Sequence, residues 1–206
     1  MHRRDEVVGR MWRDGIVDFA RGLVHPAWGL SHCERAYRMT MELSAEEGMH
    51  VREPVVFAVA YLHDAGAFDP YCAEGQPQHE CSARAAAEVL KAVRFPDEYA
   101  YIVLDCIRAH DFERPPLPIS ESRCFHDADI LDFMGAVGIT RLLSIVGIED
   151  WVPDVRSAVE QIRRFSETLP AKLVTEAARR TAETRRREMR AYLEELDEET
   201  ARLAEV

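Results

Sequence analysis

Residues 53–66 read EPVVFAVAYLHDAG and form a strongly apolar segment. Eight apolar residues in a row lead directly into His63 and Asp64, and Pro54 suits the first turn of a helix. By periodicity alone, a short apolar run fits a buried helix or a buried strand. The helical patterns on both sides favour a helix. We therefore predict that a buried helix delivers an imidazole and a carboxylate at its C-terminal end.

Amphipathic patterns precede this stretch. Apolar residues recur at three- and four-residue steps across residues 5–24, which predicts an amphipathic helix. The loop HPAWGLS, residues 25–31, follows, and Ser31 is well placed to cap a second helix with Glu34 as its capping-box partner. We expect this second helix to run to about Glu47, just before a glycine.

Helical patterns also dominate the rest of the chain. After a polar loop at residues 65–78, helices are predicted at residues 79–93, 97–110, 121–134, 136–146 and 152–165. Pro170 then opens a long final helix. No period-2 strand pattern is found, so the predicted fold class is all-α. We predict a single domain over residues 1–206, a helical bundle with its core at about 25–147 and a C-terminal helical extension at about 151–206.

The net charge of the chain limits the classes of partner that it is expected to bind. The 206 residues carry a formal net charge of −11, which argues against a nucleic-acid polymer or a membrane surface, because both are polyanionic. A small anionic substrate remains compatible, because a bound metal ion can invert the local field. No stretch approaches the roughly 18 apolar residues that span a bilayer, and residues 1–15 lack the apolar run of a signal peptide. We therefore expect a cytoplasmic protein.

The cysteine pattern favours the same compartment. The five cysteines form no CxxC pair, and an odd count suits a reducing cytosol better than a disulfide framework. We predict free thiols, buried or partly buried, at all five positions. These positions are Cys33, Cys72, Cys81, Cys106 and Cys124.

Histidine and carboxylate residues are the candidates for chemistry, because they ligate Mn, Fe, Co, Ni and Zn. His-Asp pairs occur three times, starting at His63, His110 and His126, so only the context separates them. The pair at His63 follows the buried run, where a carboxylate without a partner would be costly and the helix dipole favours a cation. The alternative is a buried Asp64 that is held by helix caps or by an arginine.

Two further phrases carry a resemblance to a known family. They are HPAWGLSHCERAYRM at residues 25–39 and DADILDFMGAVGITRLL at residues 127–143. The order His, His-Asp and then a distant Asp resembles the HD superfamily of metal-dependent phosphohydrolases. The second phrase and the tail at residues 165–196 resemble a small stand-alone bacterial branch of it. That branch usually carries a lysine where this chain has Thr168.

The resemblance implies a metal site and a reaction. It implies that one divalent transition metal is held by four ligands, His32, His63, Asp64 and Asp129. The metal would activate a water that hydrolyses a nucleotide or a related small phosphoester. Two alternatives stay open, an HD-type di-iron oxygenase and a non-catalytic metal-binding module. The sequence leaves open the exact substrate, the native metal and the oligomeric state.

Residues around this set have candidate roles as well. His79 and His110 match the positions that complete a second metal site in two-metal HD proteins; alternatively they bind the water or the phosphate, or are structural. Arg35 lies one turn after His32 and is a candidate phosphate clamp or an ordinary surface ion pair.

Four further residues are candidates near the site. Arg141 follows GAVGIT and is another phosphate candidate. Asp132, one turn after Asp129, is expected to support the metal ligand. Asp69 and Glu80 are candidate proton donors to the leaving group.

Overall fold

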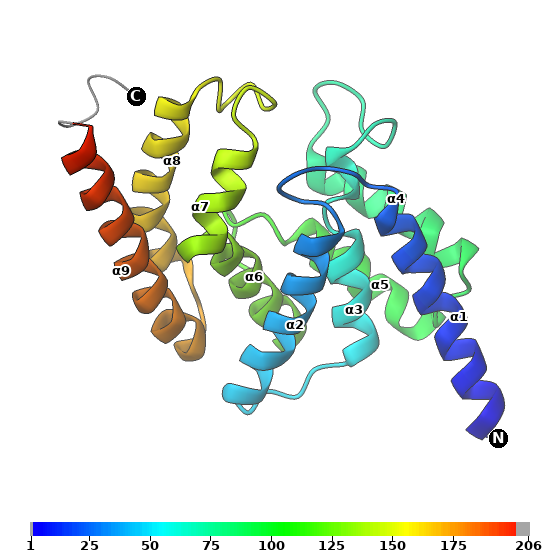
Figure 1. The fold of residues 1–206 in the computed structure, drawn as a ribbon. Helices are drawn as coiled ribbons and strands as arrows, with labels where there is room; N and C mark the ends of the chain where they lie inside the picture. The colour runs from blue at the N-terminus through cyan, green and yellow to red at the C-terminus, as the bar shows by residue number, and fades with distance from the viewer. Residues whose placement is uncertain (1, 201–206) are drawn as a thin grey trace. The chain divides into compact units, whose positions relative to one another are not determined.

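Residues 2–200 of the chain fold into helices and loops. The computed structural model describes residues 2–200, with side chains from residue 11 onward, and this part contains no strand, as Figure 1 shows. The predicted all-α class is therefore confirmed. Residues 201–206 of the predicted C-terminal extension lie outside the described residues.

The chain divides into two compact units, Met1–His126 and Asp127–Val206. The first unit holds α1 (His2–Arg21), α2 (Leu30–Glu46), α3 (Glu53–Leu62), the 3-10 turn η1 (Ala65–Ala67), α4 (Gln78–Ala92), α5 (Asp97–Arg108) and the start of α6 (Ser120–Asp132). The second holds the rest of α6, α7 (Gly135–Ser144), α8 (Val155–Thr168), the 3-10 turn η2 (Leu169–Lys172) and α9 (Glu176–Glu199). The single domain proposed from the sequence, with its stated core and extension, stays a prediction.

Helix α3 forms the centre of the first unit. Every residue from Val55 to Leu62 is buried, and α3 contacts α1, α2, α4 and α5. This explains why its sequence is apolar all round rather than amphipathic. Trp12 of α1 packs edge-on against Phe57 of α3 and against Phe95, with ring centroids 5.6 and 4.9 Å apart. Burial of each large apolar side chain contributes about 1.5–3 kcal/mol.

The start of α3 is tied to the first turn of α6. Glu121 accepts hydrogen bonds from the backbone N–H and the Nε of Arg52, both at 2.7 Å, and from its Nη2 at 2.9 Å. Arg52 is the N-cap residue of α3. Burial alone would raise the pKa of Glu121, but the bonds from Arg52 outweigh it and hold that pKa below its ordinary value. The ion pair therefore fixes α6 beside α3.

The start of α2 differs from the prediction. Its N-cap is Gly29 rather than Ser31, and no side chain caps the helix. The cause is the tight loop before it, where a Cβ on Gly29 would lie 2.8 Å from the carbonyl oxygen of His25. The backbone carbonyl of Gly29 accepts the N–H of His32 instead, at 2.9 Å. The final helix also starts later than predicted, because η2 follows Thr168 and α9 begins only at Glu176.

The second unit packs α9 against α7 and α8. The carboxylate of Asp127 accepts the backbone N–H groups of Val174 and Thr175 at 3.0 and 2.7 Å, and the Thr175 hydroxyl at 2.7 Å. Thr175 in turn caps α9. Arg141 and Asp132 form a buried ion pair at 2.9 Å. These polar contacts satisfy groups that would otherwise be costly to bury.

None of the described helices combines the length and the apolar character that are needed to cross a bilayer.

Candidate metal centre

His63 and Asp64 lie where the sequence predicts them, directly after α3. His63 is fully buried, and its Nδ1 lies 3.1 Å from the carbonyl oxygen of Ala60. A carbonyl can only accept, so in the neutral ring Nδ1 carries the proton and Nε2 carries the lone pair that can bind a cation. The end of α3 therefore selects the tautomer that a metal ligand needs.

His32 of α2 meets His63 ring to ring. Their Nε2 atoms lie 3.1 Å apart, and both side chains are fully buried. Asp64 Oδ2 lies 3.2 Å from His63 Nε2 and 3.6 Å from His32 Nε2. Two ring nitrogens and a carboxylate oxygen thus converge on one point from two different elements of the first unit.

His110 approaches the same carboxylate from the end of α5. Its Nδ1 lies 2.6 Å from the carbonyl oxygen of Ile107, and its Nε2 lies 3.8 Å from Asp64 Oδ1. The arrangement repeats that of His63, with a helix carbonyl fixing the proton on Nδ1. His110 is buried, and its ring centroid lies 5.2 Å from that of His63.

The histidines dominate the electrostatics of Asp64. Burial raises the pKa of this carboxyl, but His63, His32 and His110 together outweigh burial and hold the pKa well below its ordinary value. Asp64 is therefore ionised at neutral pH and presents a negative charge to the converging ring nitrogens.

Helix α6 presents Asp129 along one face. Glu121, Phe125 and Asp129 recur every four residues, so they share that face. Glu121 binds Arg52, and the ring of Phe125 lies 4.9 Å from that of His63. Asp129 is buried on the same face of α6.

The donor set fits a divalent transition metal. Ligand atoms about 2.1 Å from one ion and at right angles to each other lie about 3.0 Å apart, and the separation approaches about 4 Å as the angle opens. The 3.1 Å between the His32 and His63 nitrogens and the 3.2 Å from His63 to Asp64 match adjacent ligands. Imidazole together with carboxylate is the combination that first-row transition metals favour.

The remaining predicted residues of the first unit lie on α2, on α4 and in the loop between η1 and α4. His79 lies in the first turn of α4 and is 8% exposed. Glu80 is exposed and pairs with Arg108 at 3.3 Å. Asp69 is exposed in the loop after η1, and Arg35 is half-buried on α2.

Asp132 and Arg141, two further predicted residues, contact each other. Asp132 is the ion-pair partner of Arg141, whose guanidinium lies 4.1 Å from the ring centroid of Phe133. This contact accounts for the burial of both charged side chains, and their expected roles at the site stay predictions.

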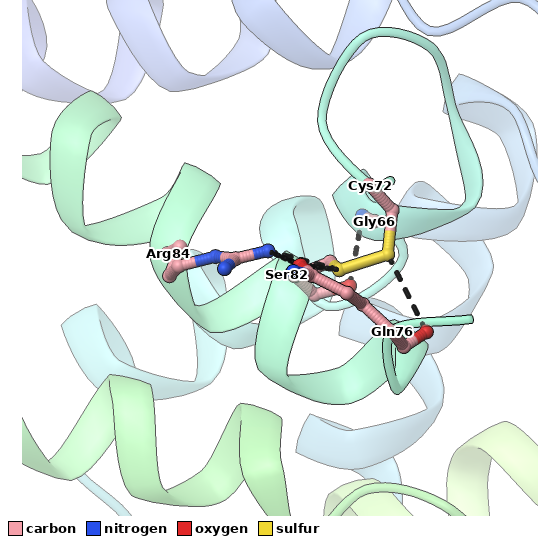
Figure 2. The surroundings of a disulfide bond; sticks show 6 residues. Gly66, Cys72, Gln76, Ser82 and Arg84 are labelled. Atoms are coloured by element: carbon pink, nitrogen blue, oxygen red, sulfur yellow. Dashed lines mark hydrogen bonds between the residues drawn. A yellow bond between two sulfur atoms is a disulfide. The ribbon is translucent and has the colours of Figure 1, made fainter. Parts of the chain in front are cut away.

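The prediction of five free thiols is wrong for two of them. Cys72 and Cys81 form a disulfide, and their Cα atoms lie 5.2 Å apart. Figure 2 shows the surroundings of this bond. The loop after η1 turns back onto the first turn of α4, and sequence spacing alone does not reveal that path. The cysteine count therefore no longer argues for a reducing compartment, and a cytoplasmic location stays a prediction. The other three cysteines are free and buried, as predicted.

Gln78 is a contact of the site that the sequence analysis missed. It is the first residue of α4, and its Nε2 donates a hydrogen bond to Asp64 Oδ1 at 3.1 Å. Its place just before His79 was the available signal, because side chains in the first turn of a helix extend beyond its start.

The comparisons with known proteins agree with this geometry. Residues 29–134 match the family model of the HD domain. Several solved structures share the fold. A protein from Lactobacillus plantarum is 21% identical with a TM-score of 0.70, and the match covers 92% of this chain and 97% of that one.

Two further solved structures have a similar fold. Bacillus subtilis YpgQ in complex with ADP is 22% identical with a TM-score of 0.68, over 91% of this chain and 97% of that one. An HD-superfamily hydrolase from Bacillus thuringiensis is 22% identical with a TM-score of 0.65, over 92% and 97% of the two chains. None of the curated proteins matches this chain.

Proposed function

Because the chain belongs to the HD-domain family, we propose that it is a metal-dependent phosphohydrolase that acts on a nucleotide or a related small phosphoester. The observation that carries this proposal is the convergence of His32, His63 and Asp64 on one point inside the protein. The family and the HD-superfamily hydrolase among the structural neighbours support a metal-dependent hydrolase.

Four residues would hold the metal in this proposal, and each is positioned by its own element. His32 comes from α2, His63 and Asp64 follow α3, and Asp129 comes from α6. A divalent ion bound there supplies a Lewis acid for the phosphoryl group and lowers the pKa of a bound water. Mn, Fe, Co, Ni and Zn all suit this set of nitrogen and oxygen ligands.

His110 and His79 are assigned to the substrate side of the site. The Nε2 of His110 faces Asp64 Oδ1, so this nitrogen can accept a proton from water there and, once protonated, can donate to a phosphate oxygen. His79 is nearly buried at the start of α4, where the helix dipole favours an anion. A second metal ion held by these two histidines is the alternative, and the metal count decides between the two assignments.

Four charged residues complete the proposal for the substrate. Arg35 is half-buried and lies one turn after His32. In this proposal its guanidinium binds the phosphate group of the substrate. Asp69 and Glu80 are exposed on the loop and the helix that follow Asp64, and one of them would protonate the leaving group. Arg141 stays a further phosphate candidate, and its buried pair with Asp132 would orient the guanidinium.

A nucleotide is the proposed substrate class for two reasons. YpgQ, which has the same fold, was solved in complex with ADP. The net charge of −11 also suits a small substrate that is drawn in by a metal ion better than it suits a polyanionic polymer.

A hydrolysis screen with metal analysis tests the proposal. The protein is assayed on nucleoside mono-, di- and triphosphates with Mn²⁺, Co²⁺, Ni²⁺ or Zn²⁺ added, and its metal content is measured on the same sample. Phosphate release that is lost in His63→Ala is the expected result. Bound metal without turnover would identify a binding module, and bound iron with oxygen consumption would identify an oxygenase.

A further inference from the structure

Gln78 contacts Asp64, the proposed metal ligand that also lies near three histidines. The Oδ2 atom of Asp64 faces His63 and His32, and its Oδ1 atom faces Gln78 and His110. The amide N–H of Gln78 donates to Oδ1, which fixes the rotation of the carboxylate and so the direction in which Oδ2 points. Groups that orient a metal ligand in this way typically change metal affinity 10–100-fold when they are removed.

The start of α4 places Gln78 by direct backbone packing. A Cβ on Gly66 would lie 2.4 Å from the carbonyl oxygen of Gln78. The N–H of Gly66 donates to the hydroxyl of Ser82 at 2.9 Å, a contact that Figure 2 shows. The turn that follows Asp64 and the first turn of α4 therefore touch without a side chain between them.

The disulfide adds a covalent restraint to the same turn. Cys81 lies one helical turn after Gln78, and its partner Cys72 lies on the loop that joins η1 to α4. The bond closes a loop with a sequence separation of nine residues. Gln76 of this loop also bonds to Arg84 of α4, as Figure 2 shows. The loop and the start of α4 thus form one unit.

We propose that Gln78 is a positioning residue for Asp64 and that the Cys72–Cys81 disulfide holds it in place, so that thiol–disulfide exchange changes the affinity of the centre for its metal. This inference rests on the proposed function, because it takes Asp64 to be a metal ligand. It adds a residue and a covalent bond that control the proposed site.

The surroundings of the two sulfur atoms define the direction of exchange. Cys72 is half-buried and Cys81 fully buried, so an external dithiol attacks the Cys72 sulfur and Cys81 leaves as a thiolate. The Nη2 of Arg84 lies 3.2 Å from the Cys81 sulfur and stabilises that leaving thiolate. The second thiol of the dithiol then displaces Cys72. The protein gains two thiols and the dithiol becomes a disulfide.

The other cysteines do not compete in this exchange. Cys33, Cys106 and Cys124 are buried. Burial raises the pKa of the Cys106 thiol to about 12, which leaves almost no thiolate at neutral pH. A change in metal affinity on reduction can therefore be assigned to the Cys72–Cys81 bond.

Thiol counting and Co²⁺ titration of the full chain test the inference together. Protein purified without reductant and then denatured should show three thiols, and five after treatment with a dithiol. Gln78→Met keeps the side-chain length and removes the N–H donor. Cys72→Ser opens the disulfide without a reductant that would itself bind the metal. We expect each variant to raise the Co²⁺ dissociation constant about 10-fold, the lower end of the range for such partners.

The double variant separates positioning from general loosening of the fold. If the disulfide acts through Gln78, Cys72→Ser in the Gln78→Met background should add little to the dissociation constant. The Co²⁺ absorption spectrum should also change in both single variants, while their circular dichroism stays helical. An additive effect in the double variant would overturn the link between the disulfide and Gln78.

The remaining outcomes are equally distinct. Five thiols without reduction, or wild-type affinity in both single variants, would overturn this inference while metal binding by the wild type still supports the proposed function. Absence of Co²⁺ binding by the wild type would overturn the proposed function and this inference with it.

Discussion

The substitution Gly66→Ala probes the contact that holds the start of α4 against the metal centre. The new Cβ would lie 2.4 Å from the carbonyl oxygen of Gln78, 2.6 Å from the backbone nitrogen of Ser82 and 2.8 Å from the Cβ of Cys81. Two of these atoms belong to the backbone and cannot rotate away. Ordinary van der Waals contact begins at 3.4 Å, so the start of α4 must shift by about 1 Å.

The expected cost follows from these contacts. Overpacking of this kind costs about 1–3 kcal/mol, and weakening the bond from Gly66 to Ser82 adds about 1 kcal/mol. We therefore expect the free energy of unfolding to fall by about 2–4 kcal/mol, as measured by urea denaturation. Metal affinity should fall about 10-fold, because Gln78 moves away from Asp64.

A matched control lies in the loop that joins η1 to α4. Gly75 has a φ of +77° and no atom within 4 Å of its ideal Cβ position. Gly75→Ala therefore adds backbone strain of about 1 kcal/mol without a clash, and metal affinity should stay at the wild-type value. Wild-type stability and metal affinity in Gly66→Ala would refute the claim that α4 rests directly on the turn after Asp64.

Three further predictions concern other parts of the site. Arg52→Ala removes the guanidinium donors of the buried Glu121 carboxylate and leaves backbone donation in place. The free energy of unfolding should fall by about 2 kcal/mol, less than the roughly 3–5 kcal/mol for breaking a fully buried ion pair, because the Arg52 side chain is 37% exposed. Folding lowers the pKa of Glu121, so the stability that this carboxylate contributes is complete above about pH 4.3. That stability is lost as the pH falls through the folded-state pKa. The urea midpoint of Arg52→Ala should therefore fall less than that of the wild type when the pH is lowered below about 4.3. Asp64→Ala should abolish metal uptake and turnover while circular dichroism stays helical; turnover at the wild-type rate would contradict its assignment as a ligand. His110→Ala should slow turnover and leave the metal count at one ion per chain, whereas a fall from two ions to one would establish the second metal.

Local sequence signals predicted the central part of the site. The run from Val55 to Leu62 is too apolar to be anything but buried, and its length and neighbours indicated a helix. The pairing of His63 with Asp64 at its end followed directly. These features depend on residues that are close in the chain, which is why the apolar run, its helical neighbours and the dipole argument were sufficient.

Features that depend on the path of a loop were not predictable in this way. Cys72 and Cys81 meet because the loop after η1 folds back on α4, and that loop has no periodic pattern to read. Gln78 reaches Asp64 for the same reason. Ser31 carries a good capping signal, but the close approach of Gly29 to the preceding loop determines where α2 begins. Tertiary contacts outweighed local preference at each of these positions.

The continuity of α6 limits how this chain can be divided into fragments. The division between the compact units falls after His126, inside a helix that runs from Ser120 to Asp132. A fragment that stops at His126 would keep His32, His63 and Asp64 but would lose Asp129, and only seven residues of α6 would remain. A helix that short is not stable by itself in water. Proteolysis, truncation or gene fusion at this division would therefore remove a proposed ligand, and the match to the HD domain accordingly extends past it to residue 134.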